Sequence, residues 1–288
     1  MTHIAYLGTG LLGSGLAEAA AKRGNIVAVW NRTIDKARAL EQFGARVATT
    51  PAEAVRGAEH VHLVLRDDPV VDEVIAALRP GLAPGAIIID HTTNQPALTA
   101  ERSVRLNAEG VRYIHCPVFI GPAAARNAQG IVLASGPKPL FDAIRPELEQ
   151  MGSRVEYFGE RPDLAAVYKL CGNAYIIGIA ALVADVFAIA RGAGVAPKDT
   201  LAIMDFFNPT SIIANRGRNM AAGNTAPGFE LEMARKDVRL MLETADSIPL
   251  AVLPGVAERM DALIARGHGA EDLAVLGRDA ISAYSLPS

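Results

Sequence analysis

Three glycines near the start of the chain constrain its fold more than any other feature. Gly8, Gly10 and Gly13 form the pattern GxGxxG, which ends the apolar run IAYL and opens a stretch, LLGSGLAEAAAKRG, that predicts a helix. Here the first glycine permits a tight turn, the second lets the backbone approach a pyrophosphate, and the third lets the helix pack closely on the sheet. The motif predicts a dinucleotide site rather than a turn with only a packing role. The residues expected to line it are Gly8, Thr9, Gly10, Leu11, Leu12 and Gly13.

Short apolar runs alternate with helical stretches through the first half of the chain. The runs that predict further strands are 25–32, 45–49, 60–67, 86–93, 111–119, 130–136 and 154–159. Residues 33–44 and 69–85 predict helices between them. This alternation predicts an α/β fold with a doubly wound parallel sheet and helices on both faces.

Strand signals stop after Gly159, and the rest of the chain predicts helices. Residues 163–191 predict a single helix, about 43 Å long at 1.5 Å per residue. Further helices are predicted to begin at Pro197 and to cover residues 230–245. We therefore expect a dinucleotide-binding domain over residues 1–161 and an all-helical domain for dimerisation and substrate binding over residues 162–288.

The predicted helix 163–191 is apolar on nearly every side, which is typical of a helix that is buried all round. The rest of the helical domain is too short to wrap it, so we expect a homodimer through this helix. It contains Asp185 and lacks the flanks of a membrane span, which argues against a transmembrane segment. We interpret Asp185 as a capping or interface-paired carboxylate rather than a general acid.

Composition narrows the classes of partner. The net charge is −3 and no basic block is present, so nucleic acid and anionic membranes are not expected partners. The two cysteines, Cys116 and Cys171, are not in a CxxC spacing and are interpreted as reduced thiols. The first residues lack the pattern of a signal peptide, which favours a cytoplasmic protein.

The segment WNRT, at the end of the second predicted strand, bears on the choice of cofactor. NAD sites usually carry Asp or Glu there, which binds the ribose 2′-hydroxyl. This chain instead has Asn31, Arg32 and Thr33, followed one helical turn later by Lys36. Because a guanidinium, a hydroxyl and an ammonium suit a 2′-phosphate, the segment predicts NADP(H).

Two further segments carry candidate site residues. Leu65 and Arg66 end the fourth predicted strand, where ligands of parallel sheets bind, so we expect them to contact the cofactor. His60 and His62 alternate on that strand and share one face. No third ligand lies nearby in the sequence, so we expect a sheet-face packing role and no metal site.

Several motifs over nearly the whole chain resemble the β-hydroxyacid dehydrogenase family, which includes 3-hydroxyisobutyrate dehydrogenases and glyoxylate/succinic semialdehyde reductases. The opening IAYLGTGLLGSGLAEAAAKRGNIVAVWNRTIDKARAL resembles the start of that family. IIIDHTTNQP resembles its D-x-S-T-x-x-P loop, which would bring Thr93 near the nicotinamide. GFELEMARKDVRL resembles its late K-D-L motif, which implies a cofactor role for Lys236. The family fold is a Rossmann domain followed by an all-helical domain that dimerises through the long helix.

The same resemblance implies catalytic roles for Lys169 and Asn173, which lie in the segment AAVYKLCGNAYIIG. Residues i and i+4 share a helix face, so both side chains would face the interdomain cleft. Lys169 would give a proton to the developing oxyanion while hydride is transferred, and Asn173 would bind the substrate oxygen or orient the lysine. Without the resemblance, a lysine that extends to solvent would be the simpler interpretation.

The chain departs from the dehydrogenase pattern at its substrate loop. The family's D-A-P-V-S-G-G is replaced by HCPVFIGP, in which Phe119 and Ile120 take the places of a serine and a glycine that hold a substrate carboxylate. This loop, with Gly121, and the segment RPDLAAVY resemble the imine reductases, a sister group on the same fold. We expect an apolar pocket to which Phe207 also contributes.

Three functional hypotheses follow. The first is an NADPH-dependent reductase of small carbonyl compounds with Lys169 as proton donor, and the second is an imine reductase. The third is a protein that binds NADPH without turning it over, which would need neither Lys169 nor Asn173. A nucleophile formed by Cys116 and His115 is disfavoured because adjacent strand residues point to opposite faces.

Overall fold

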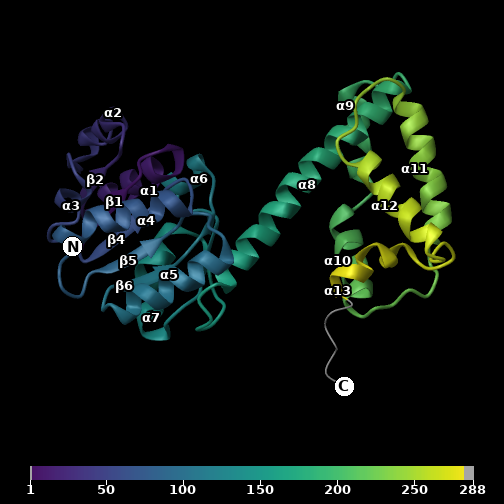
Figure 1. Cartoon of the computed structure of the whole chain (residues 1–288). Helices are drawn as coiled ribbons and strands as arrows, with labels where there is room; N and C mark the ends of the chain where they lie inside the picture. The colour runs from purple at the N-terminus through teal and green to yellow at the C-terminus, as the bar shows by residue number, and fades with distance from the viewer. Residues whose placement is uncertain (1, 282–288) are drawn as a thin grey trace. The chain divides into compact units, whose positions relative to one another are not determined.

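A computed structural model describes residues 2–281. The chain forms two compact units, of which the first ends at Asn173 and the second begins at Ala174 (Figure 1). The division falls inside the long helix α8 (Leu164–Gly192), beyond the domain boundary that the sequence predicts near Pro162. Each unit is described by itself below.

The first unit is built on a six-stranded parallel sheet with strand order β3-β2-β1-β4-β5-β6. Its strands are β1 (His3–Leu7), β2 (Ile26–Trp30), β3 (Arg46–Val47), β4 (His60–Leu63), β5 (Ile87–Asp90) and β6 (Arg112–His115). The predicted doubly wound parallel sheet is therefore confirmed. The order reverses between β1 and β4, and such a switch point is where open α/β sheets bind ligands.

The helices of this unit cover both faces of the sheet. Alternate residues of β1 enter separate apolar clusters: Ile4 and Tyr6 pack with α1 and α7, whereas Ala5 and Leu7 pack with α3, α4 and α5. The helices are α1 (Leu11–Lys22), α2 (Ile34–Arg38), α3 (Pro51–Ala54), α4 (Asp68–Leu78), α5 (Pro96–Ala108), α6 (Pro122–Arg126) and α7 (Lys138–Met151), with 3-10 turns η1 (Glu41–Phe43) and η2 (Arg79–Gly81).

A second, three-stranded sheet was not predicted. It has the order β7-β8-β9, with β7 (Val118–Phe119) antiparallel to β8 (Ile131–Ala134), and β8 parallel to β9 (Arg154–Tyr157). The prediction of one strand over 111–119 was wrong because Pro117, which lacks an N–H donor, separates β6 from β7. Because of this break, Phe119 belongs to the small sheet and not to the main one.

The second unit is helical, as predicted. Residues 163–191 do form one long helix, α8, whereas the helix predicted at Pro197 is only one turn long. Its elements after α8 are α9 (Pro197–Thr200), η3 (Leu201–Asp205), α10 (Pro209–Ala221), α11 (Leu231–Ala245), α12 (Leu253–Ala265), η4 (Leu273–Gly277) and α13 (Arg278–Ile281).

Asp185 fixes α8 to the start of α12. Its buried carboxylate accepts hydrogen bonds from the backbone N–H groups of Ala251 (2.6 Å), Val252 (2.9 Å) and Leu253 (2.9 Å). Burial acts to raise the pKa of Asp185, but the three donors outweigh it and hold that pKa below its ordinary value. Asp185 is thus a capping carboxylate.

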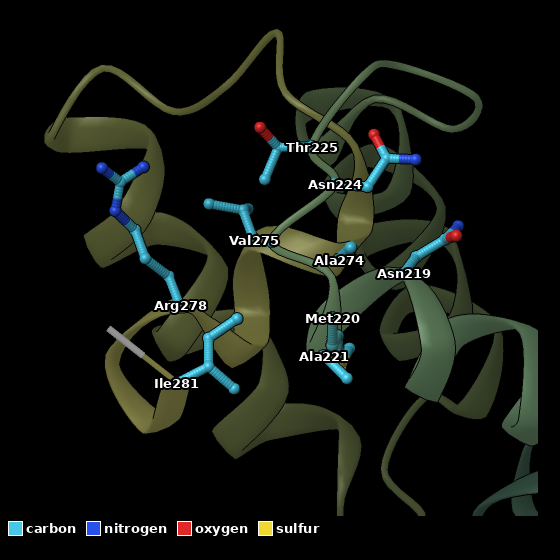
Figure 2. A pocket seen from close by; sticks show the side chains of 10 residues that line it. Asn219, Met220, Ala221, Asn224, Thr225, Ala274, Val275, Arg278 and Ile281 are labelled. Carbon is cyan, nitrogen blue, oxygen red and sulfur yellow. The ribbon is translucent and has the colours of Figure 1, made fainter. Parts of the chain in front are cut away.

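The second unit also contains a cavity of about 600 Å³ between α10 and the turn formed by η4 and α13 (Figure 2). Figure 2 shows polar side chains, among them Asn224, Thr225 and Arg278, around an apolar floor that includes Val275. None of its lining residues was predicted as a site residue.

A buried polar chain crosses one face of the main sheet. His60 and His62 both contact the carboxylate of Glu147 on α7, with His62 Nε2 at 2.8 Å. His62 Nδ1 lies 2.8 Å from His91 Nε2, and His91 Nδ1 lies 2.6 Å from the Cys116 carbonyl oxygen. Among residues 2–281, no group of three or more His, Cys, Asp or Glu side chains is arranged to hold a metal ion.

The groups at the two ends of this hydrogen-bonded row, the Cys116 carbonyl and the Glu147 carboxylate, determine where its protons lie. A carbonyl only accepts, so His91 Nδ1 donates to Cys116. Burial and the neighbouring His62 lower the pKa of His91 to about 3, so its ring is neutral and its Nε2 accepts from His62 Nδ1. Burial acts to raise the pKa of Glu147, but His62 and His60 hold it well below its ordinary value. With Glu147 ionised, its carboxylate can only accept, so His62 Nε2 donates to Glu147 and His62 Nδ1 donates to His91.

Replacing Glu147 by Gln should therefore strongly destabilise the first unit. Removing one partner of a buried ion pair costs about 3–5 kcal/mol, to be measured by urea unfolding at neutral pH. Glu149→Gln is the matched control, since Glu149 lies on the same helix in an exposed pair with Arg145 and should change stability by less than about 0.5 kcal/mol.

The pH dependence has a defined sign. The pKa of Glu147 is lower in the folded chain than in the unfolded one, so its contribution is complete above the ordinary carboxyl pKa and is lost as the pH falls below it. The difference between wild type and Glu147→Gln should shrink in acid. Equal unfolding midpoints for the Glu147 and Glu149 variants at neutral pH would contradict the ion pair.

Candidate active site

The turn between β1 and α1 leaves no room for side chains at two of its three glycines. A Cβ atom on Gly8, whose φ is +98°, would lie 2.2 Å from the Val64 carbonyl oxygen, and one on Gly13 would lie 1.9 Å from the Gly8 carbonyl oxygen. Gly10, the residue before α1, has no atom within 4 Å of its Cβ position. The turn is thus closed on the protein side and open where a phosphate would approach.

A cavity of about 320 Å³ lies at this turn, at the carboxyl ends of β1, β2 and β4. The predicted cofactor residues that line it are Gly8, Gly10, Asn31, Arg32, Thr33, Lys36, Leu65 and Arg66. The sequence reasoning missed Trp30, Val64, Val70, Glu73 and Val74, which complete the wall. Trp30 and Val64 lie at strand ends, a position that marks ligand-facing residues in such sheets.

Two cationic side chains at this cavity, Arg32 and Lys36, are not paired with a carboxylate among the described residues and could bind a phosphate. Within residues 2–281, neither Arg32 nor Lys36 has an ion-pair partner, because the nearby Asp35 is paired with Arg38 at 3.0 Å. Asn31 has a different part: its side chain accepts from Thr9 N (3.0 Å) and donates to the Thr33 carbonyl (2.9 Å). Asn31 therefore holds the glycine turn against the segment that carries the cations.

These features fit a dinucleotide. The first turn of α1 presents free backbone N–H groups beside open space at Gly10. The hydroxyl of Thr9 is buried and has no hydrogen-bond partner among the described residues. Arg32, Thr33 and Lys36 would bind the adenosine end, and the loops after β4 and β5 would flank the nicotinamide.

The loop after β5 is fixed from beneath. Thr92 Oγ1 accepts from Leu65 N at 3.1 Å, which ties the loops after β4 and β5 together. Asp90 accepts from Thr92 N (2.9 Å), and His115 Nε2 donates to the Thr92 carbonyl (2.9 Å). Thr93 itself is exposed. His115 is therefore a buried support of the loop, and burial also raises the pKa of the Cys116 thiol, as expected for an inert cysteine.

Lys169 and Phe119 lie in contact within the first unit. The Lys169 Nζ is 4.1 Å from the centroid of the Phe119 ring, and the lysine is only 9% exposed. Burial lowers the pKa of Lys169. Asn173 follows one turn later on α8 and is half-buried, while Ile120 and Gly121 continue from Phe119 to α6.

Two predicted site residues belong to the second unit, and their roles stay predictions. Lys236 lies on α11 and is paired with Asp237 at 2.9 Å. Phe207 follows η3 and is 46% exposed.

Comparison with known families gives matches to both halves of the chain. Residues 3–159 match the family described as the NAD binding domain of 6-phosphogluconate dehydrogenase. Residues 164–278 match the family described as NAD-binding of NADP-dependent 3-hydroxyisobutyrate dehydrogenase.

Curated relatives include enzymes and longer proteins. Glyoxylate/succinic semialdehyde reductase 1 of Arabidopsis thaliana is 28% identical over 94% of this chain and 95% of its own length. The cytokine-like nuclear factor N-PAC of Homo sapiens is 27% identical over 85% of this chain. The chain spans only 45% of the length of that relative.

Among solved structures, the likeness to imine reductases concerns the fold. The Streptomyces aurantiacus imine reductase has a TM-score of 0.86 at 25% identity, covering 96% of this chain and 99% of that one. The Myxococcus stipitatus imine reductase in complex with NADP+ has a TM-score of 0.87 at 23% identity, with the same coverage. Together with the glycine turn, its cavity and the buried Lys169, the two family matches show that the chain carries an NAD(P)-binding domain and belongs to the β-hydroxyacid dehydrogenase family, of the 3-hydroxyisobutyrate dehydrogenase type.

Proposed function

We propose that the protein is a cytoplasmic, NADPH-dependent reductase that transfers hydride to a small carbonyl compound, with Lys169 as proton donor. One observation carries the proposal: a buried lysine on an apolar helix lies in the same compact unit as the dinucleotide cavity. A buried charge without an ion-pair partner is costly and is usually retained for function.

The residues of the site have separate roles in this reaction. When bound, NADPH supplies the hydride. Lys169 gives its proton to the oxygen that gains charge, and Asn173 orients the lysine or the substrate oxygen. Thr93, at the exposed tip of a rigid loop, would contact the nicotinamide.

Imine reduction is the second candidate. Phe119 and Ile120 form an apolar wall with no side-chain donor for a substrate carboxylate. The reductive aminase from Aspergillus terreus, solved with NADPH and ethyl levulinate, has a TM-score of 0.84 to this chain at 22% identity. The same lysine would then protonate the nitrogen of a C=N bond.

The choice of NADPH over NADH depends on Arg32. Replacing Arg32 by Ala should raise the Kd for NADPH about 10- to 100-fold and leave that for NADH nearly unchanged, since one charge-assisted contact to the 2′-phosphate is lost. Fluorescence titration measures both constants, and Arg56→Ala, which removes an exposed arginine that does not line the cavity, is the control. Equal catalytic efficiency of the wild type with NADH and NADPH would refute this assignment.

The role of Lys169 is tested by Lys169→Met. We expect kcat to fall about 10²- to 10⁴-fold with NADPH affinity nearly unchanged, whereas exposed Lys138→Met should change neither. NADPH oxidation is followed with succinic semialdehyde, with its uncharged methyl ester and with an uncharged cyclic imine, and the faster of the two uncharged substrates identifies the bond reduced. Because the donor must be protonated, activity should fall as the pH rises through the lowered pKa of Lys169. NADPH binding without turnover of any of these substrates would favour the third hypothesis, a protein that binds NADPH without turning it over.

We also infer a homodimer through α8. Among described helices, α8 is the one long and apolar enough to cross a membrane, and only 11% of its most apolar window is buried. Its exposed large apolar residues are Tyr168, Leu170, Tyr175, Ile176, Ile177, Ile179, Leu182, Val183 and Val186. The buried cap at Asp185 fixes the helix to its own unit, which favours a second copy over lipid as the cover of this face.

Ile177→Glu should convert the dimer to a monomer, because Ile177 is 68% exposed in the single chain and a charge there opposes burial. Sedimentation equilibrium measures the mass of the assembly. Val104→Glu on α5, at a position 66% exposed, should leave it unchanged. A wild-type protein that sediments as one chain would contradict the dimer.

A further inference from the structure

The contact between Phe119 and Lys169 is held by the backbone on both sides. Phe119 pairs with Ile131 in the small sheet, which fixes the strand that presents the ring. Gly130, with φ of +110°, closes the same hairpin, since a Cβ there would lie 2.6 Å from the Phe119 carbonyl oxygen. The position of the ring is therefore set by the fold rather than by a flexible loop.

Helix α8 has no side chain at Gly172, the position that faces the Phe119 ring. A Cβ atom on Gly172 would lie 2.2 Å from Phe119 Cζ, 2.8 Å from Cε1 and 3.1 Å from Cε2. Lys169 and Gly172 are three residues apart and share a helix face. The tip of the ring therefore lies where the missing side chain would be, and the ring centroid is 4.1 Å from the Lys169 ammonium.

An aromatic face in this position affects charges of opposite sign differently. Its electron-rich face attracts the ammonium group. It offers no hydrogen bond to an anion and disfavours a carboxylate placed against it. Within the described part of the first unit, no carboxylate lies within ion-pair distance of Lys169, whereas the Phe119 ring is close enough to stabilise its charge.

We propose that Phe119 and Gly172 form a specificity-determining pair that reserves Lys169 for neutral carbonyl or imine substrates and disfavours small substrates that carry a free carboxylate. This inference rests on the proposed function. The carbonyl carbon receives hydride from NADPH, which is oxidised to NADP+, and the oxygen receives the Lys169 proton to give an alcohol. The neutral amine then regains a proton from water.

The test compares succinic semialdehyde with its methyl ester, which differ in charge but share the reacting aldehyde. We expect the wild type to favour the ester at least tenfold in kcat/KM. Phe119→Ser should lower that ratio at least tenfold, because a hydroxyl replaces the ring. Wild-type preference for the acid, or an unchanged ratio in Phe119→Ser, would overturn the pair.

Gly172→Ala tests the gap without removing the ring. In the wild-type background the added methyl must displace Phe119, so the ester preference should fall at least threefold. In the Phe119→Ser background the same change should have no effect, because no ring is left to displace. Gly255→Ala on α12, where no atom lies within 4 Å of the Cβ position, is the control for a helix glycine. If Gly172→Ala and Phe119→Ser had independent effects on the ester preference, the proposal that the two residues act as a pair would be refuted.

Phe119→Leu separates charge stabilisation from burial and needs no turnover. Leucine keeps the site apolar but removes the aromatic face, so the pKa of Lys169 should fall by about half a unit to one and a half units. Competitive acetylation of Lys169 against pH, read by mass spectrometry, measures this directly. An unchanged or raised pKa would overturn the role of the ring. Absence of turnover with any aldehyde or imine would instead contradict the proposed function, and this labelling result would still stand.

Discussion

The first unit depends on three backbone segments that meet without side chains between them. The carbonyl oxygens of Val64 and Gly8 occupy the places where Cβ atoms on Gly8 and Gly13 would lie. This contact sets the distance between β1, β4 and α1, and so places the helix start beside the switch point of the sheet. Loops on either side are joined to the same frame, through Asn31 to Thr9 and through Thr92 to Leu65.

The parallel sheet could be predicted from the sequence because its strands are nearly continuous apolar runs, as burial on both faces requires. The long helix was equally clear from its length and composition. The small sheet could not be predicted, since its shortest strand has two residues and is separated from β6 only by Cys116 and Pro117. Sequence periodicity cannot resolve elements of that length.

The cofactor cavity was predictable for a similar reason, since its glycines and cations follow strand ends at fixed spacing. Contacts between residues that are far apart in the sequence could not be predicted in this way. Glu147 and His62 are separated by 85 positions, and Asp185 accepts from Leu253 across 68. The sequence shows Lys169 and Phe119 as separate candidates, but only the small sheet explains why the ring lies on the ammonium.

The buried ion pair of His62 and Glu147 also has a consequence for synthesis of the chain. A buried ring N–H is costly in free energy until its hydrogen-bond acceptor is in place. The strand that carries His62 leaves the ribosome long before α7, so the inner face of the sheet must stay hydrated or locally open during that interval. The first unit is therefore expected to fold as one cooperative body once α7 has emerged, and not strand by strand from its N-terminus.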